Sequence, residues 1–223
     1  MSTAGNSRRQ KRKRIMKKTL LVVLTMMFAL SGFSQQRLAT LSHNDTITTF
    51  YGQSALSQAH AAAVNGDVIT LSSGVFDAIV ITKAVTIRGA GMWTIDSLNI
   101  ENTVIAGAMT LNVPYDSLHH LEIEGMKFSL TTYVMQATNP VFRKCRMTDW
   151  YRNNNGVMSG AQFYHCVLDS YTENDLTGAQ FINSVILNLS APSTLMNCVA
   201  RISGSFSTLA SMTIYNSVVY DVN

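Results

Sequence analysis

The chain has 223 residues, of which 47% are hydrophobic, so it is long and apolar enough for one domain with a sizeable core. Its formal net charge is +4, but eight of the 17 Lys and Arg residues lie in residues 1–34, which contain no Asp or Glu. Nine basic and 13 acidic residues therefore remain, a net charge of −4. This excludes a nucleic-acid-binding protein that works through a generally basic surface.

Residues 1–34 have the organisation of a secretory signal peptide. Basic residues up to Lys18 precede the apolar run Thr19–Phe33, and small and polar residues follow it. The run is shorter than the roughly 20 apolar residues that a spanning helix needs. We expect cleavage after Gly32 or Ser34 and export to the extracellular space or cell surface, with the periplasm as an alternative.

The next elements are an irregular lead-in over residues 35–53 and a helix over residues 54–64. Helix formers dominate the second stretch, Ser54 is a candidate N-cap, and Gly66 is a candidate left-handed C-cap. Apolar, β-branched runs then predict strands over residues 68–71, 78–81 and 85–87, with a turn at residues 72–74.

A six-residue pattern recurs from residue 87 onward. Each copy has a large apolar residue first, usually Asn or Gly third, a small residue or Cys fourth, and usually an apolar residue sixth. The clear copies begin at Phe142, Phe163, Phe181, Leu195 and Ile214, and looser copies begin at Ile87, Ile100 and Ile123. Such self-similarity predicts a solenoid, and the Leu-x-x-Leu-x-Leu ladder of leucine-rich repeats is absent.

Parity explains the pattern. First and sixth positions of a straight strand point to opposite sides, so two apolar residues there require a bend between them. Gly or Asn at the third position tolerates the left-handed conformation of such a bend. The occupants of this position are Gly89, Asn102, Gly125, Lys144, His165, Asn183, Asn197 and Asn216.

The bend places the fourth position inside and the second position outside. Cys145, Cys166 and Cys198 all occupy the fourth position, so we expect an inward ladder of small residues rather than a metal site. A Cys145–Cys166 disulfide is the alternative, because exported proteins reach an oxidising environment. Asn183, Asn197 and Asn216 at the third position are expected to stack as an amide ladder, with His165 as a member.

The beginning of the repeat region resembles a known superfamily. The stretch reads Ser54-Ala-Leu-x-x-Ala, then Ala63-Val-x-Gly66-Asp67-Val-Ile69-x-Leu71-x-x-Gly74-Val-Phe76, and later Ile87-Arg-Gly89-Ala-Gly91. It is similar to the N-terminal cap and first coil of pectin-lyase-like proteins. The resemblance covers roughly residues 54–219.

The resemblance implies an all-β fold, a single-stranded right-handed parallel β-helix with a short N-terminal capping α-helix, over residues 54–223. In such a fold the helix covers the open end of the first coil. No capping element follows the last repeat, so we expect either a fragment, incomplete at the C-terminus, or a chain closed by a partner.

The resemblance also implies action on polysaccharides. Lyases of this type use acidic residues for Ca²⁺ and a basic residue for proton abstraction beside a uronate, whereas hydrolases use paired carboxylates. No catalytic motif of the family matches here, so the catalytic residues are unknown, and no cofactor or metal is expected unless the chain is a Ca²⁺-dependent lyase.

Candidate glycan contacts lie on the second-position stripe and on two longer excursions, residues 148–156 and 169–178. The stripe offers Glu101, Glu124 and Arg143, and the first excursion offers Trp150-Tyr151-Arg152, since aromatic rings stack on pyranose faces and Arg pairs with carboxylates. Charged residues on a solvated strand face and aromatic residues packed onto the core are the structural alternatives.

Two short motifs stand apart from the repeat. His119-His120 beside Asp116 resembles a ligand or base cluster, against the alternative of a polar turn before the strand at residue 121. Asp45-Thr46-Ile47, Asp96-Ser97-Leu98 and Asp116-Ser117-Leu118 resemble a bacterial O-glycosylation pattern.

These observations favour a secreted, noncatalytic module that binds glycans or serves adhesion or structure. The alternative is a polysaccharide lyase or glycoside hydrolase of the pectin-lyase-like superfamily. The expected partner is an extracellular polysaccharide or cell-surface glycan. We expect neither nucleic acid nor, after signal cleavage, a membrane span.

Overall fold

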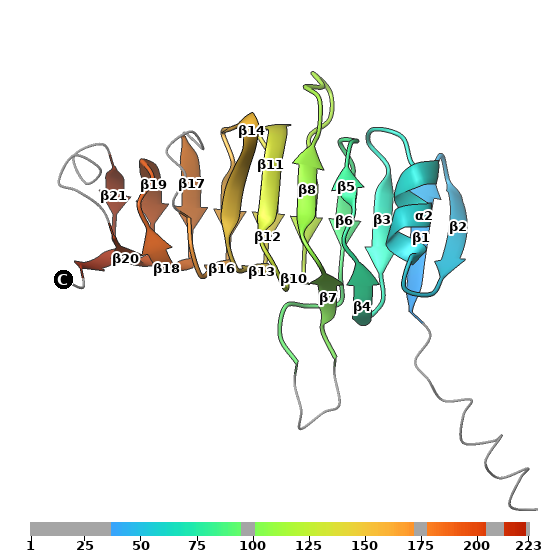
Figure 1. Ribbon diagram of the computed structural model, residues 1–223, viewed down its shortest axis with the longest axis horizontal. Coiled ribbons are helices and arrows are strands. Elements are labelled where there is room, and N and C mark those ends of the chain that lie inside the picture. Colours follow the sequence, from blue (N-terminus) through green and yellow to red (C-terminus); the bar gives the residue numbers. More distant parts are fainter. Residues whose placement is uncertain (1–36, 95–100, 172–177, 204–211, 222–223) are drawn as a thin grey trace, which may run out of the picture. The chain divides into compact units, whose positions relative to one another are not determined.

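The computed structural model describes residues 37–94, 101–171, 178–203 and 212–221, without the side chains of residues 152–155 (Figure 1). The signal-peptide prediction, the triplet at Asp96 and most of the excursion at 169–178 lie outside these ranges. The described residues are mostly β, with one α-helix, α2 (Ala55–Ala62). An all-β class is therefore confirmed. None of the helices in the described residues has the length and apolar character needed to cross a membrane.

The strands of the described residues form three sheets. Sheet A runs in the order β2 (Thr46–Tyr51), β1 (Leu38–His43), β3 (Val68–Leu71), β6 (Thr86–Arg88), β9 (Glu122–Glu124), β12 (Val141–Arg143), β15 (Gln162–Tyr164), β17 (Ala179–Ile182), β19 (Ser193–Met196) and β21 (Thr213–Tyr215). Sheet B contains β4 (Gly74–Asp77), β7 (Thr103–Ala106), β10 (Lys127–Phe128), β13 (Arg146–Met147), β16 (Val167–Leu168), β18 (Val185–Leu189), β20 (Val199–Ile202) and β22 (Val218–Asp221). Sheet C contains β5 (Val80–Ile81), β8 (Met109–Asn112), β11 (Thr132–Thr138) and β14 (Trp150–Ser159).

From β3 onward the chain visits the sheets in a repeated order, A, then B, then C in the first four rounds, and the neighbours within each sheet are parallel. The first positions of the repeat stand in one register in sheet A and form the core. They are Ile87, Ile123, Phe142, Phe163, Phe181 and Leu195, which are buried, and Ile214, which is 41% exposed in the last strand.

The bends at the third position are confirmed at six of eight predicted places. Gly125, Lys144, His165, Asn183, Asn197 and Asn216 all have φ between 44° and 69°. Gly89 and Asn102 do not have a positive φ. Lys144 and His165 adopt the strained conformation without being Gly or Asn, so the position in the fold, rather than the residue, imposes it.

The two exceptions have one cause. The copies at Ile87 and Ile100 are two halves of a single repeat, because β6 pairs with β9 in sheet A while β7 pairs with β10 in sheet B. Residues 90–102 are inserted at the bend between them. Glu101 therefore does not lie on the outer stripe of sheet A, and that prediction is wrong.

The lead-in at 35–53 is a β-hairpin rather than irregular. β1 pairs antiparallel with both β2 and β3, so the hairpin extends sheet A. Asn44 and Asp45 form the two-residue turn with φ of 45° and 60°, as tight hairpins require. The Thr- and Ile-rich alternation around this Asn-Asp pair was the missed signal.

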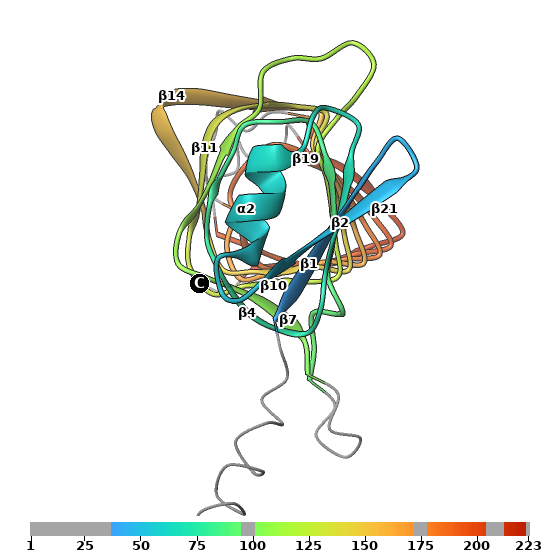
Figure 2. The same ribbon diagram turned by 90° about the vertical axis from the view of Figure 1, so that its right-hand side faces the viewer.

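The predicted helix is confirmed as α2, which buries Ala55, Leu56 and Ala59 against the core. In Figure 2, which looks along the stack of strands, α2 lies across the end of the core. Its termini differ from the prediction. The Ser54 side chain makes no capping hydrogen bond, and the helix ends at an extended Ala63, while the left-handed Gly66 lies three residues further on.

The early strands match in part. β3 has the predicted bounds, β6 is shifted by one residue, and only Val80 and Ile81 of the strand predicted over residues 78–81 form a strand, β5. Residues 74–77, where the predicted turn ends, form β4, since Gly74 pairs with Thr103 at the start of sheet B.

The prediction that residues 148–156 leave the repeat as a loop is wrong. They contribute to β14, which pairs with β11 through a register shift. At Gly156 the backbone of Val134 lies so close that there is no room for a Cβ atom. An Asn-rich segment can thus form a strand because the shift and the bare glycine accommodate its extra length.

The fourth positions form the expected inward ladder. Cys145, Cys166, Ser184 and Cys198 are buried, and all three thiols are free rather than joined in a disulfide. Each Cys donates to backbone carbonyls, as Cys166 does to Phe142 and Tyr164 and as the Ser184 hydroxyl does to Phe163 and Ile182. Burial raises the pKa of Cys145 well above its usual value.

Candidate functional site

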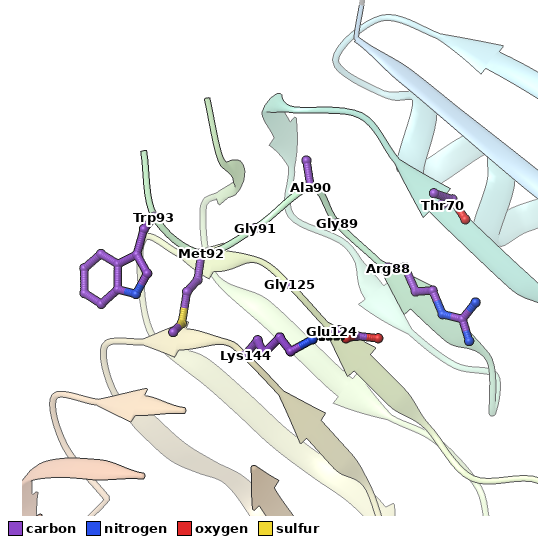
Figure 3. Close-up of a pocket in the computed structure, with 10 residues that line it drawn as sticks. All are labelled: Thr70, Arg88, Gly89, Ala90, Gly91, Met92, Trp93, Glu124, Gly125 and Lys144. Atoms are coloured by element: carbon purple, nitrogen blue, oxygen red, sulfur yellow. Dashed lines mark hydrogen bonds and ion pairs between the residues drawn. The ribbon is translucent and has the colours of Figure 1, made fainter. Parts of the chain in front are cut away.

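A groove of about 630 Å³ lies on the outer face of sheet A, beside the insertion at residues 90–102 (Figure 3). Strands β3, β6 and β9 contribute Thr70, Arg88 and Glu124, and Lys144 follows β12. The remaining lining residues are Gly89, Ala90, Gly91, Met92, Trp93 and Gly125.

Glycines allow the insertion to leave the sheet here. The amides of Gly89 and Gly91 donate to the carbonyls of Glu124 and Gly125, both at 2.8 Å. A Cβ atom on Gly89 would collide with the Gly125 carbonyl oxygen. This close approach, together with φ values of 146° at Gly91 and 69° at Gly125, leaves a floor of bare backbone.

Thr103 fixes the other end of the insertion. Its buried hydroxyl accepts the Ala90 N–H at 2.7 Å and donates to the Ser72 carbonyl at 2.8 Å, while its N–H donates to the Gly91 carbonyl. The departing and returning segments are therefore tied together at the base, which positions residues 91–93 beside the groove.

Trp93 provides an aromatic surface at the groove. Its side chain is 49% exposed, and the Arg146 guanidinium carbon lies 5.0 Å from its ring centroid. A cation over one ring face helps to hold the indole. The sequence prediction missed Trp93, and its signal was an aromatic residue directly after Gly-Ala-Gly-Met in a departure from the repeat.

The charges in the groove are mostly positive. Glu124 pairs with the Lys144 ammonium at 3.2 Å, whereas Arg88 makes no ion pair with any described residue. Arg88 stands directly opposite Glu124 in the register of sheet A. Because Glu124 is the one carboxylate among the described lining residues, the groove lacks the pair of acids that glycoside hydrolysis requires.

Arg143 lies on the same stripe but is already engaged. Its Nε donates to Glu122 at 2.7 Å, and its guanidinium lies 4.4 Å from the Tyr164 ring centroid. The structure thus places Glu124 and Arg143 on one face of sheet A, as predicted for the stripe. Glu101 lies apart from them and is exposed within the insertion.

Trp150 and Tyr151, the aromatic pair of residues 148–156, point to opposite faces of the sheet. Trp150 is only 2% exposed and packs edge-to-face on Phe142, Phe163 and Tyr171, so stacking of its ring on a surface glycan is excluded. Tyr151 is 53% exposed beside Tyr133. The side chain of Arg152 lies outside the described residues. Alternation along β14 explains why neighbours face opposite sides.

The Asp116 and His119-His120 motif forms a polar turn. Asp116 accepts the N–H groups of Leu118 and His119 and the side-chain amide of Asn65. These bonds lower the pKa of Asp116 to about 2, those from Leu118 and His119 having the largest effect. Nearby, His43 Nδ1 lies 2.7 Å from Asp67 Oδ1 at a second groove of about 530 Å³, which His119 also lines.

No grouping of three or more His, Cys, Asp or Glu side chains suited to a metal ion occurs in the parts of the chain that the structure describes. Comparisons with protein-family models, curated proteins and solved structures found no match to this chain. The geometry of the groove is therefore the main guide to function.

Proposed function

We propose that this protein is an exported, right-handed parallel β-helix of the pectin-lyase-like type that binds a glycan without turning it over. The repeated order of the three sheets, the parallel register and the α2 cap support the fold. The basic leader and apolar run of residues 1–34 support export.

The observation that carries glycan binding is the exposed face of Trp93 beside the charges of the groove. The C–H groups of a pyranose pack on an aromatic ring, and hydroxyl or carboxylate oxygens accept hydrogen bonds from Arg and Lys. Trp93 would supply the stacking surface, and Arg88 and Lys144 the donors. The bare backbone floor at Gly89 and Gly125 leaves room for the sugar.

The second candidate function is that of a polysaccharide lyase, which Arg88 favours because it makes no ion pair with any described residue. A basic side chain beside a bound uronate is the group that abstracts a proton in such reactions. A Ca²⁺-dependent lyase would need further carboxylate ligands from outside the described residues, since Glu124 is the one carboxylate among them that lines the groove.

The test is an incubation of the secreted full-length protein with a polysaccharide panel, with and without Ca²⁺. We expect binding to at least one glycan without new reducing ends or unsaturated-uronate absorbance. Trp93→Ala should weaken that binding at least tenfold, about 1.4 kcal/mol. Tyr51→Ala, at an exposed tyrosine outside the groove, is the matched control. Product formation would overturn the noncatalytic proposal, and unchanged affinity of Trp93→Ala would overturn the site.

A further inference from the structure

Two triplets of the same chemistry occupy exposed turns far along the chain from one another. Asp45-Thr46-Ile47 spans the end of the β1–β2 turn, and Asp116-Ser117-Leu118 lies in the excursion after β8. Thr46 and Ser117 are both exposed. The aliphatic residues that follow them are 71% exposed at Ile47 and 83% exposed at Leu118, among the most exposed large apolar side chains described.

The two hydroxyl groups are chemically available. Neither Thr46 nor Ser117 makes a side-chain hydrogen bond with a described residue. Serines elsewhere in the fold are engaged, as Ser129 is with the Ile105 carbonyl and Ser184 with that of Phe163. A hydroxyl that supports the fold has a partner, so these two are not needed for it.

Each hydroxyl lies at or directly beside a tight turn. Positive φ angles at Asn44 and Asp45 make the hairpin turn before Thr46. In the second triplet, Asp116 Oδ1 accepts the N–H groups of Leu118 at 2.7 Å and His119 at 3.0 Å, which folds the chain around Ser117. An enzyme can therefore approach each side chain without local unfolding.

Both triplets lie away from the glycan-binding groove. Asp45 and His119 line the same 530 Å³ groove, together with Val68 at the start of β3, whereas Thr70, near the end of β3, lines the groove of Trp93. Figure 1 shows the excursion after β8 on the opposite side of the strands from residues 90–94. A bulky group on Thr46 or Ser117 would leave the binding groove open.

We propose that Thr46 and Ser117 are acceptors for O-linked glycosylation, by a transferase that reads an acidic residue before the hydroxyl and an aliphatic residue after it. The hydroxyl oxygen attacks the anomeric carbon of a sugar activated as a diphosphate ester. The new bond joins this oxygen to the anomeric carbon, and the anomeric carbon–phosphate oxygen bond breaks. The diphosphate leaves with the electron pair, and a base of the transferase takes the hydroxyl proton.

The two aspartates serve the triplets differently. Asp45 has no hydrogen bond to a described residue, so its carboxylate is free for the transferase, whereas the Asp116 carboxylate is occupied in shaping the turn. Asp45→Asn, which removes the charge and keeps the size, should therefore abolish modification at Thr46.

The experiment is mass spectrometry of the full-length protein, purified after export from the organism that encodes it. We expect an intact mass above that of the processed polypeptide and glycopeptides that map to Thr46 and Ser117. Thr46→Ala and Ser117→Ala should each remove one glycan mass, and the double variant should remove both. Thr46→Ser should keep the modification.

Thr48→Ala is the matched control, since Thr48 is exposed on the same strand but lacks a preceding acid. Its mass should differ from the wild type by the side-chain change alone. Circular dichroism verifies that each variant folds. An intact mass equal to that of the unmodified polypeptide would overturn the proposal, and so would glycans attached at Thr48 rather than at Thr46 or Ser117.

Discussion

At the scale of single residues, one backbone position governs the repeat. The third position has a left-handed conformation in six repeats, and this conformation costs an ordinary residue about 1–2 kcal/mol. Asn reduces the cost, and its side chain continues the column, as Asn216 donates to Asn197 at 2.7 Å. His165 and Lys144 are therefore positions where the fold overrides local preference.

His165→Asn should stabilise the protein by about 0.5 kcal/mol, because Asn tolerates the φ of 55° better and can bond to the Asn183 amide beside it. His165→Ala should instead destabilise it by about 1 kcal/mol. Urea unfolding of the three proteins at neutral pH measures both changes. A less stable Asn variant would show that the imidazole itself contributes to the column.

His60 is the second residue whose environment differs from its usual one. It lies in the last turn of α2 and is buried, its Nε2 accepts the Thr82 N–H, and the Lys83 ammonium lies nearby. Burial, then repulsion by Lys83, lowers the pKa of His60 from 6.5 to about 4.

Since His60 takes up a proton more readily in the unfolded chain, the folded state should lose stability as the pH falls from about 6.5 to about 4. His60→Gln retains an acceptor but has no charge to gain, so its urea midpoint should fall less between pH 7 and pH 4.5 than that of the wild type. Asp116 titrates below this window. Equal falls in both proteins would contradict the assignment.

At the scale of elements, the unit is a short strand, a bend and a second short strand, whose side chains stack on the next unit. Phe142, Phe163 and Phe181 stack at centroid distances of 5.0 and 4.8 Å, and Trp150 and Tyr171 pack on them edge-to-face. The fourth position, in contrast, is occupied at residues 145, 166, 184 and 198 by Cys or Ser, whose side chains bond to backbone carbonyls.

Cys166→Ser should therefore cost less than about 1 kcal/mol, because Ser184 makes the equivalent bonds one unit further on. Cys166→Leu should cost about 1–3 kcal/mol through overpacking. The comparison uses urea midpoints. If Ser proved as costly as Leu, the ladder would depend on sulfur rather than on small size.

At the scale of the whole molecule, the insertion at residues 90–102 matters most. It interrupts one repeat and places Trp93 in the lining of a groove that Arg88, Glu124 and Lys144, which are distant in sequence, also line. The repeat forms the regular outer face of sheet A, and the insertion at residues 90–102 forms the candidate groove beside it.

Export is the whole-molecule property that the leader predicts. Leu24→Arg puts a charge in the middle of the apolar run, so the precursor should accumulate inside the cell with its leader uncleaved. Immunoblots of cells and medium, with N-terminal sequencing of the secreted wild type, measure this. Secretion of the variant at wild-type levels would contradict a signal peptide.

The amino-acid sequence was sufficient to predict the repeat, its bends, the inward small residues and the helix α2. Each of these features follows from the local alternation of apolar and polar residues and from residues that tolerate a left-handed backbone. The information is therefore present within short stretches of the sequence. It did not determine that the copies at Ile87 and Ile100 are halves of one unit, or that β1 and β2 extend sheet A. These facts depend on which strands pair across tens of residues.

Which tryptophan is available to a ligand depends on tertiary packing and could not be predicted from the sequence. The chain has two tryptophans, Trp93 and Trp150, and each lies shortly after a copy of the six-residue pattern. Packing buries Trp150 because β14 turns it toward Phe142 and Phe163, whereas the close approach of Gly89 to Gly125 carries Trp93 out of the sheet. Burial is set by neighbours distant in sequence, and the repeat pattern does not encode them.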